Sequence, residues 1–444
     1  MKPMPNRNDA ASVFGLGRSG RALITHLVKR GVRVYAFDDA KREDLGDIPL
    51  WLSSLGVPLF TEGRGEARGD FVFRTPAMRP DHPALLRAAL RGAVISGEAE
   101  YFVSLCPSPV YAVTGSDGKT TTSTMLAGLL QDAGIRTYLG GNIGRSLLPF
   151  LDEMTEKDVC VLELSSFQLI DMECRFTKGI VTNLTPNHLN WHKSFEEYVK
   201  AKRRLPEQSA ERVLPCGLFE DMTAVRFSLR REAEFVLRDG VLCGYGIPLC
   251  RKEDVKLLGE HNLLNLLAAS AAAASSVTPD TVKRFATRFC GAPHRMQRVG
   301  EWEGVTYIDS SIDTTPTRTA VTVGVQKEHG RLLLLLGGRS KGLSYEPLIS
   351  ALAGTDTRCF LFGEAKEEIA RALFPTGRAY VCFDRMEDAF FAAEREAAAG
   401  DIVLLSPSAT SYDAFADFEA RGDAFSALVN EKMKKTKDRK KNES

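Results

Sequence analysis

The segment Val110-Tyr-Ala-Val-Thr-Gly-Ser-Asp-Gly-Lys-Thr-Thr121 runs from an apolar strand through a glycine loop into a helix. Glycines in such a loop let backbone N–H groups turn toward phosphate oxygens, and the helix N-terminus adds the positive end of its dipole. Lys119 would reach the β- and γ-phosphates of a nucleotide, and the Thr120 hydroxyl would ligate Mg²⁺. The predicted phosphate loop consists of Gly115, Ser116, Asp117, Gly118, Lys119, Thr120 and Thr121.

This loop is a variant of the common G-x-x-x-x-G-K-[ST] pattern, because position 113 is Val113 rather than glycine. A tight strand–helix turn without a ligand is the alternative. The preceding strand, together with Gly118-Lys119-Thr120, favours phosphate binding.

Strand and helix patterns alternate on both sides of the loop. Upstream, strands at 11–15 and 33–37 flank a helix at 18–30, which is typical of a parallel βαβ unit. Downstream elements are a helix at 121–132, strands at 159–164 and 180–183, an alanine-rich helix at 262–274, and strands at 305–308, 332–336, 359–362, 379–383 and 402–405. The alternation predicts an α/β protein with parallel sheets.

Proline-containing loops near Pro107 and His294 separate three such series. We therefore predict domains at 1–106, 107–294 and 295–431, and a basic, disordered tail at 432–444. The length of 444 residues agrees with this division, at roughly 150 residues per domain.

Composition excludes several classes of protein. The 58 Lys and Arg against 57 Asp and Glu leave a formal charge of +1, which argues against a dedicated nucleic-acid binder. No apolar run approaches the roughly 20 residues of a membrane helix, and no signal peptide is visible. The nine cysteines contain no Cys-x-x-Cys pair, so a disulfide or zinc framework is not expected. We expect a cytoplasmic enzyme without membrane insertion, acting as a monomer.

A second glycine motif, Gly15-Leu-Gly17-Arg-Ser-Gly20, lies between the first strand and helix, and Asp38 ends the next strand. The spacing fits a dinucleotide-binding turn with a ribose-binding carboxylate. Alone it indicates only that a phosphorylated group can approach the backbone there, and a pure packing role is the alternative.

Polar side chains also follow two later strands. Glu163 ends a buried strand near the phosphate loop, where an acid is a natural Mg²⁺ ligand, although a solvated strand-end acid is the alternative. His188 and His192 follow the next strand. Their i, i+4 spacing could suggest zinc, but no third ligand is evident.

Five motifs in this order resemble the ATP-dependent Mur ligases of bacterial cell-wall synthesis. They are the phosphate loop, Glu-Leu-Ser-Ser-Phe-Gln-Leu from Glu163, the histidine segment, Ala-Lys-Arg-Arg from Ala201 and Gly-Glu-His-Asn-Leu-Leu-Asn from Gly259. The resemblance spans 11 to about 430. The signature from Leu405 to Gly422 is most similar to the D-glutamate-adding branch.

The resemblance implies a Rossmann-like UDP-binding domain, a central P-loop ATPase domain and a Rossmann-like C-terminal domain. It implies that Thr120, Glu163, His188 and Lys202, the last as a CO₂-derived carbamate, hold two Mg²⁺ ions, and that Lys119 is catalytic with them. For ATP it adds Asn262, Asn265 and Arg295; for UDP it implies Gly15, Gly17 and Asp38; for the muramoyl group, Asn142 and Ser165; and for D-glutamate, Lys341, Ser411 and Phe418.

Three positions depart from the family pattern. The histidine segment usually starts Asp-His and here reads Asn187-His188. The usual Asn-Asp-Ser after the interdomain strand is Asp309-Ser310-Ser311, so the acid is displaced by one residue. A lysine that some relatives carry next is Ile312 here.

The activity implied is ATP-dependent addition of D-glutamate to UDP-N-acetylmuramoyl-L-alanine through an acyl phosphate. One alternative is another ligase of this type, such as the L-alanine-adding enzyme or a folate polyglutamate ligase; residues 1–106 speak against the latter. The other is a nicotinamide dehydrogenase fused to a nucleotide-binding module, which leaves Lys202 and the signature from Leu405 to Gly422 unexplained.

Overall fold

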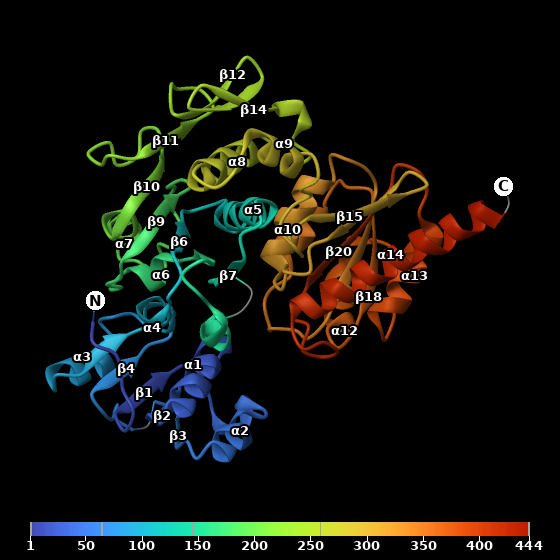
Figure 1. The fold of residues 1–444 in the computed structure, drawn as a ribbon. Coiled ribbons are helices and arrows are strands. Elements are labelled where there is room, and N and C mark those ends of the chain that lie inside the picture. Colours follow the sequence, from blue (N-terminus) through green and yellow to red (C-terminus); the bar gives the residue numbers. More distant parts are fainter. Residues whose placement is uncertain (1, 64, 144–145, 258, 443–444) are drawn as a thin grey trace. The chain divides into compact units, whose positions relative to one another are not determined.

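The computed structural model describes residues 2–63, 65–143, 146–257 and 259–442, with side chains as far as Lys434. The chain divides into two compact units, Met1–Phe289 and Cys290–Ser444. The first unit holds two sheets and the second holds one (Figure 1). Three α/β domains with mostly parallel sheets confirm the predicted fold class.

The N-terminal sheet is parallel, with the strand order β3-β2-β1-β4-β5. Its strands are β1 (Ala10–Phe14), β2 (Arg33–Asp38), β3 (Leu59–Thr61), β4 (Phe71–Phe73) and β5 (Val94–Ser96), and its helices are α1 (Arg18–Lys29), α2 (Ile48–Ser54), α3 (Pro83–Leu90) and α4 (Glu98–Leu105). The chain runs outward on both sides of β1. The Gly15 loop therefore lies at the switch point between β1 and β4, where such sheets bind ligands.

The central sheet has the order β14-β13-β12-β11-β10-β9-β6-β8-β7. Its strands are β6 (Val110–Thr114), β7 (Thr137–Gly141), β8 (Val159–Glu163), β9 (Phe176–Val181), β10 (Ser209–Pro215), β11 (Val225–Ser228), β12 (Phe235–Arg238), β13 (Val241–Gly244) and β14 (Ile247–Arg251). Among the strands that the structure describes in this sheet, β12 with β13 and β13 with β14 pair antiparallel, and the other pairs are parallel. In register, Val113 lies opposite Glu163, which lies opposite Gly141, so the ends of β6, β8 and β7 lie side by side.

Helices cover both faces of this sheet. They are α5 (Lys119–Asp132), α6 (Ser166–Leu169), α7 (Phe195–Glu207), α8 (Glu260–Ala273) and α9 (Pro279–Ala286). The apolar side chains of α5, α8 and α9 share one buried cluster with alternate residues of β6 and β8. Alanine makes α8 a strong helix former and lets it pack closely on α5.

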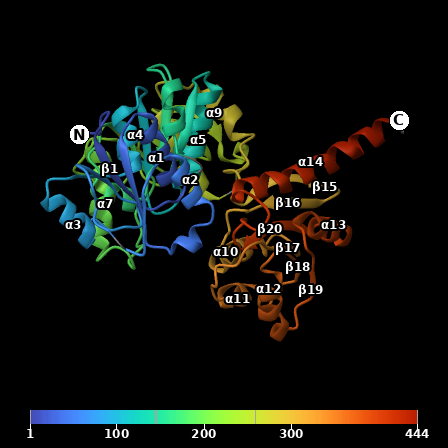
Figure 2. The same cartoon turned by 90° about the horizontal axis from the view of Figure 1, so that it is seen from below.

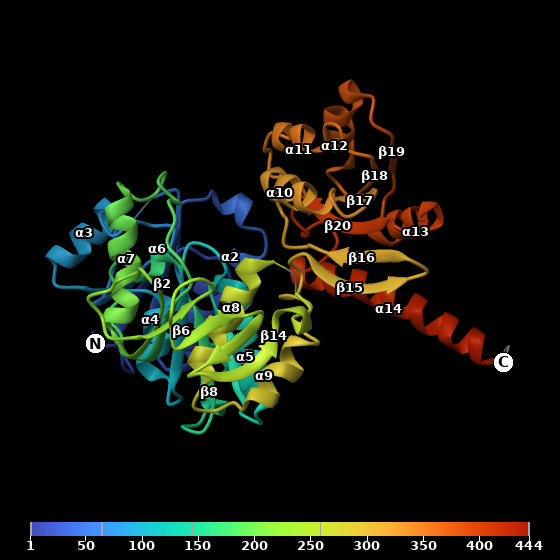
Figure 3. The ribbon, with the colours of Figure 1, turned by 90° about the horizontal axis from the view of Figure 1, so that it is seen from above.

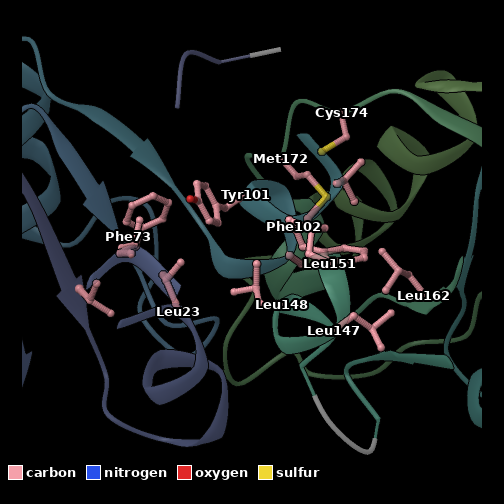
Figure 4. Close-up of a cluster of buried hydrophobic side chains, with 14 of the residues drawn as sticks. Leu23, Phe73, Tyr101, Phe102, Leu147, Leu148, Leu151, Leu162, Met172 and Cys174 are labelled. Carbon is pink, nitrogen blue, oxygen red and sulfur yellow. The ribbon is translucent and has the colours of Figure 1, made fainter. Parts of the chain in front are cut away.

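One buried cluster joins the first two domains into the first compact unit (Figure 4). Its members include Leu23, Phe73, Tyr101 and Phe102 of the N-terminal domain and Leu147, Leu148, Leu151, Leu162 and Met172 of the central domain. A polar contact reinforces it, because buried Arg74 donates from Nε to Asp171 at 2.9 Å and from Nη2 to the Phe167 carbonyl at 2.8 Å.

The C-terminal sheet has the order β15-β16-β20-β17-β18-β19, parallel except for β15 with β16 (Figure 3). Its strands are β15 (Gln297–Trp302), β16 (Val305–Asp309), β17 (Leu332–Gly337), β18 (Thr357–Phe362), β19 (Tyr380–Cys382) and β20 (Ile402–Ser408), and its helices are α10 (Pro316–Gln326), α11 (Glu346–Leu352), α12 (Lys366–Leu373), α13 (Met386–Glu396) and α14 (Phe418–Asn442). The run Leu332–Leu336 alternates between a cluster with α10, α11 and α12 and one with α13 and α14 (Figure 2).

Two further findings concern the helices. Helix α14 continues into the basic tail, but side chains beyond Lys434 lie outside the described residues, and disorder of the tail stays a prediction. Among the helices of the described residues, none has the length and apolar character to cross a membrane.

The domain bounds at 1–106, 107–294 and 295–431 stay predictions.

Candidate active site

At two positions of the phosphate loop, neighbouring side chains leave room only for glycine. Gly115 has φ +149°, and a Cβ there would lie 1.8 Å from Thr182 Oγ1. Gly118, at the N-terminus of α5, has φ +76°, and a Cβ there would lie 2.4 Å from Asn265 Oδ1. Side chains at either position would therefore push apart the elements that hold the loop.

Thr120 and Glu163 meet at the ends of α5 and β8. Thr120 Oγ1 donates to Glu163 Oε2 at 2.7 Å, and Asn142 Nδ2 donates to Glu163 Oε1 at 2.8 Å. A hydroxyl beside a carboxylate, at the mouth of a phosphate loop, is a donor set that suits Mg²⁺. Lys119 Nζ contacts the carbonyls of Gly115 and Ser116 at 3.0 and 2.8 Å. The residues predicted around the phosphates thus come together.

Lys202 lies inside this site rather than on the surface. Its side chain, on α7, is 1% exposed, and its Nζ contacts the Gly115 carbonyl at 2.7 Å and Thr114 Oγ1 at 3.1 Å. Burial and the nearby Lys119 cation hold the pKa of Lys202 well below its usual value, while Glu163 and Asp117 oppose that shift. A buried lysine with a lowered pKa has a larger neutral fraction, and only the neutral amine is a nucleophile.

The two histidines take different positions. His188 is exposed, has φ +55° and packs its ring edge-on against Phe167. Desolvation and the nearby side chains of Lys119 and Lys202 lower the pKa of His188, which keeps its ring neutral and able to ligate a metal. His192 is buried, with Nε2 at 2.9 Å from Ser166 Oγ and Nδ1 at 3.4 Å from a Glu197 carboxylate oxygen, so it supports the segment.

Residues that the sequence reasoning did not single out hold the loop in place. Asn183 Oδ1 accepts from the Asp117 amide at 2.9 Å, and Ser116 Oγ lies 2.7 Å from the Tyr198 hydroxyl. Thr182 Oγ1 donates to the Asp117 carbonyl at 2.5 Å. Asn183 and Thr182 directly follow β9, so their place beyond a parallel strand was the signal that could have found them.

Asn262 and Asn265 are buried in the first turns of α8. Asn265 Oδ1 accepts from Thr122 Oγ1 at 3.2 Å, and its Nδ2 donates to Asn262 Oδ1 at 3.3 Å. Both therefore lie behind the phosphate loop, and their place near the adenine stays a prediction.

Ser165 caps α6 in this structure. Its Oγ accepts from the Gln168 amide at 3.3 Å and contacts Gln168 Oε1 at 2.9 Å, forming a capping box. Asn142 follows β7 and Ser165 follows β8, and these two strands are neighbours. The Asn142 amide also donates to the Glu163 carbonyl at 2.8 Å. The two positions predicted for the muramoyl group thus flank Glu163.

The N-terminal glycine loop borders a cavity of about 230 Å³. Gly15 (φ +86°) and Gly17 line it, together with Arg18, Thr75 and Glu98. Asp38 faces the same loop, accepting from the Leu16 amide at 2.9 Å and the Ala40 amide at 3.0 Å. The cavity lies at the switch point of the sheet, where the sequence predicts the UDP group.

Glu98, on the cavity wall, makes stability depend on pH. Burial raises the pKa of Glu98 to about 7, and a hydrogen bond from Ser146 opposes this shift. The folded protein holds the proton of Glu98 more tightly than the unfolded chain does. The stability that this protonated carboxyl contributes is therefore complete below pH ~4.5 and is lost as the pH rises through about 7. We expect Glu98→Gln to flatten the fall of Tm between about pH 5 and pH 8. The Tm of the wild-type protein and that of the control Glu156→Gln, at an exposed site, should fall in parallel. A Tm profile of Glu98→Gln that matches theirs would contradict this assignment.

Two loops at the end of the C-terminal sheet carry Lys341 and Ser411, two of the residues predicted to bind D-glutamate. Arg339, after β17, and Thr410, after β20, bridge through backbone hydrogen bonds of 2.8 and 2.9 Å, so the loops that carry Lys341 and Ser411 lie side by side. Lys341 Nζ donates to Thr314 Oγ1 at 3.1 Å. Burial and the cations Arg318 and Arg421 lower the pKa of Lys341. Lys341, Arg318 and Arg421 therefore form a cationic corner, a group of positive charges that suits a carboxylate.

Arg421, which sequence reasoning passed over within the C-terminal signature, supports this corner. Its side chain is fully buried and donates to Ser311 Oγ at 3.0 Å and to the carbonyls of Gly337, Ala409 and Ser311 at 3.3, 3.1 and 2.9 Å. Burial lowers the pKa of Arg421 to about 10. Ser311 Oγ in turn donates to the Phe418 carbonyl at 2.8 Å, which fixes the start of α14.

The displaced acid, Asp309, points into the protein. It is fully buried, lies 2.8 Å from His294 Nδ1 and accepts from the Ser311 amide at 2.8 Å. The Asp309 carboxylate therefore positions the ring of His294, the residue that precedes Arg295 in the chain. Arg295 itself is exposed at the start of this unit.

Comparisons with known proteins agree with these features. A model of the Mur ligase middle domain matches residues 113–226, and one of the Mur ligase glutamate ligase domain matches residues 294–409. A UDP-N-acetylmuramoylalanine–D-glutamate ligase of Clostridium botulinum is 38% identical over 442 residues, which cover 94% of this chain and 96% of the relative. The ligase of the same name from Ruminiclostridium cellulolyticum is 36% identical over 452 residues, covering 96% and 97%.

A solved structure shows the same fold. The UDP-N-acetylmuramate–alanine ligase of Thermotoga maritima matches with a TM-score of 0.55 at 19% identity, covering 96% of this chain and 100% of that one. The sequence matches span both the phosphate-loop domain and the C-terminal domain, and the relatives align over nearly their whole length. The chain therefore belongs to the Mur ligase family.

Proposed function

We propose that this enzyme joins D-glutamate to UDP-N-acetylmuramoyl-L-alanine at the expense of ATP, in the synthesis of peptidoglycan precursors. The observation that carries the proposal is the meeting of Thr120, Glu163 and buried Lys202 around one phosphate loop, in a chain 38% identical to ligases of that name. A cytoplasmic monomer is the form in which we propose that it acts.

In this proposal the central domain binds ATP on the loop 115–121, with Asn262 and Asn265 toward the base and Arg295 toward the phosphates. Thr120, Glu163 and neutral His188 would hold two Mg²⁺ ions, which supply charge neutralisation for the transferring phosphoryl group when bound. Lys119 adds a positive charge at the same place. Glu163 is kept in orientation by Asn142.

Lys202 fits the role of a carbamate-bearing residue. Its ammonium form would repel Mg²⁺ and offers no lone pair. Burial favours the neutral amine, which can attack CO₂, and the resulting carbamate is an anion with oxygen ligands. The nearby Lys119 cation would stabilise that anion.

The substrate carboxylate attacks the γ-phosphorus of ATP and releases ADP, and the amine of D-glutamate then attacks the acyl carbon and expels phosphate. Substrate labelled with ¹⁸O in the alanyl carboxylate tests this order. We expect one labelled oxygen to pass into inorganic phosphate during turnover. Unlabelled phosphate would contradict the acyl-phosphate route.

Lys341 is proposed to pair with a carboxylate of D-glutamate, beside Ser411 and Phe418. Losing the charged partner of a desolvated pair costs about 2 kcal/mol or more, so Lys341→Ala should raise the KM for D-glutamate roughly 30-fold while changing the KM for ATP little. Steady-state kinetics with each substrate varied in turn measures the difference. Lys327→Ala, at an exposed lysine after α10, is the control. Equal losses for both substrates would assign Lys341 to structure or to ATP.

The UDP group is proposed to occupy the cavity lined by Gly15 and Gly17, with Asp38 holding the glycine loop beside it, and the muramoyl group to approach Asn142 and Ser165. A nicotinamide cofactor would need the same loop. Fluorescence titration with NADH distinguishes a UDP site from a nicotinamide site. We expect the UDP substrate to bind and NADH not to bind. Saturable NADH binding would favour a dehydrogenase.

A further inference from the structure

Two cysteines of the first compact unit lie in contact. Cys106 directly follows α4, in the segment that leads into the central sheet, and Cys160 is the second residue of β8. Their sulfur atoms are 3.4 Å apart. Cys160 is fully buried, whereas Cys106 is half-buried.

The surroundings of the pair distinguish the two thiols. Contact with Cys160 lowers the pKa of Cys106, and contact with Cys106 together with burial raises the pKa of Cys160. Cys106 also lies 3.6 Å from the Ser108 carbonyl, and Cys160 lies 3.6 Å from Met154 Sδ. The more exposed thiol is therefore the first to ionise, and its thiol partner is in place behind it. Reactivity toward peroxides follows thiolate character and exposure.

We propose that Cys106 and Cys160 are an oxidation site that closes to an intramolecular disulfide when the protein meets hydrogen peroxide. The Cys106 thiolate attacks one peroxide oxygen, which breaks the O–O bond and leaves a sulfenic acid and hydroxide. Cys160 sulfur then attacks the Cys106 sulfur; the S–O bond breaks, and its proton and the hydroxyl leave as water. Two thiols and one peroxide thus give one disulfide and two waters.

The geometry requires little movement. An S–S bond of about 2.0 Å needs the sulfurs to approach by about 1.4 Å. The Cys106 side of the pair follows the last residue of a helix and precedes Pro107, outside regular structure, so it is the side free to move. The bond would tie the segment between the two sheets to β8, three residues before Glu163. A thiol reductant would reopen it, as expected in a reducing compartment.

Peptide mapping of the full-length wild-type protein tests the proposal. Protein treated with a small excess of hydrogen peroxide is alkylated in denaturant without reductant, digested and analysed by mass spectrometry. We expect a cross-linked peptide pair carrying Cys106 and Cys160, which disappears after dithiothreitol. The pair should persist in the control Cys382→Ser, which removes an exposed cysteine of the other unit.

Variants identify the order of the steps. In Cys160→Ser, Cys106 should remain as a sulfenic acid that dimedone traps, and in Cys106→Ser no label should appear at Cys160. Either of two results in wild-type protein overturns the proposal: both thiols alkylated after peroxide has oxidised Cys382, or Cys106 linked to another cysteine. Neither readout depends on ligase activity, so failure here leaves the proposed function untouched.

Discussion

Replacing Lys202 with alanine should reduce ligation at least 100-fold while leaving the protein folded. The expectation rests on its position: Lys202 is 1% exposed, its Nζ lies 2.7 Å from the Gly115 carbonyl, and its carbamate would provide oxygen ligands at the Mg²⁺ site. Losing groups that merely orient metal ligands already costs 10- to 100-fold. Phosphate release measures the loss, with a thermal melt to confirm folding.

The matched control is Lys200→Ala, because Lys200 lies on the same helix and is exposed. It should retain activity. Acetate or another short carboxylic acid should restore part of the activity of Lys202→Ala by occupying the gap. It should not restore Lys202→Arg, whose guanidinium fills the space and stays cationic. Protein incubated with ¹³C-bicarbonate should show a carbamate carbon signal by NMR that Lys202→Ala lacks. Full activity of Lys202→Ala without added acid would contradict the assignment.

Lys119→Ala should lower the turnover number by 10²- to 10³-fold or more, because the methyl group cannot stabilise charge that develops on the transferring phosphoryl group. The wild-type ammonium lies over the loop, 2.8 Å from the Ser116 carbonyl and 3.0 Å from the Gly115 carbonyl. A coupled ADP-release assay at saturating substrates measures the effect.

Lys157→Ala, at an exposed lysine of the same domain, should behave as wild type. Near-normal turnover in a folded Lys119→Ala protein would refute the phosphate-loop assignment, and with it the ATP-dependent reaction.

The elements around the phosphate loop could be predicted because their signals are local. An apolar run, a glycine loop and a helical pattern gave β6 and α5 within a few residues, and the run Leu332–Leu336 gave β17. The strands β11 to β14 were not predicted, since each is only four or five residues long. One signal was present: Asp239-Gly240, with φ +47° and +78°, forms the turn between antiparallel β12 and β13.

The site was predicted less completely, because several of its contacts depend on the tertiary structure. The sequence places Glu163 at a strand end, but only strand order and register set it beside Thr120 and Asn142. By composition Lys202 reads as part of a basic helix surface, and its burial comes from packing under the loop. Arg421 shows no pattern of its own, since its role arises from carbonyls up to 110 residues away in the chain.

Phosphate release with UDP-N-acetylmuramoyl-L-alanine, ATP and a panel of D- and L-amino acids tests the central claim most directly. Release should require the UDP substrate and D-glutamate together, and the product should gain the mass of one glutamate residue. L-glutamate, L-alanine and diamino acids should leave the rate at background. Release that another amino acid supports equally well, or that proceeds without the UDP substrate, would contradict the claim that this chain is a D-glutamate-adding ligase.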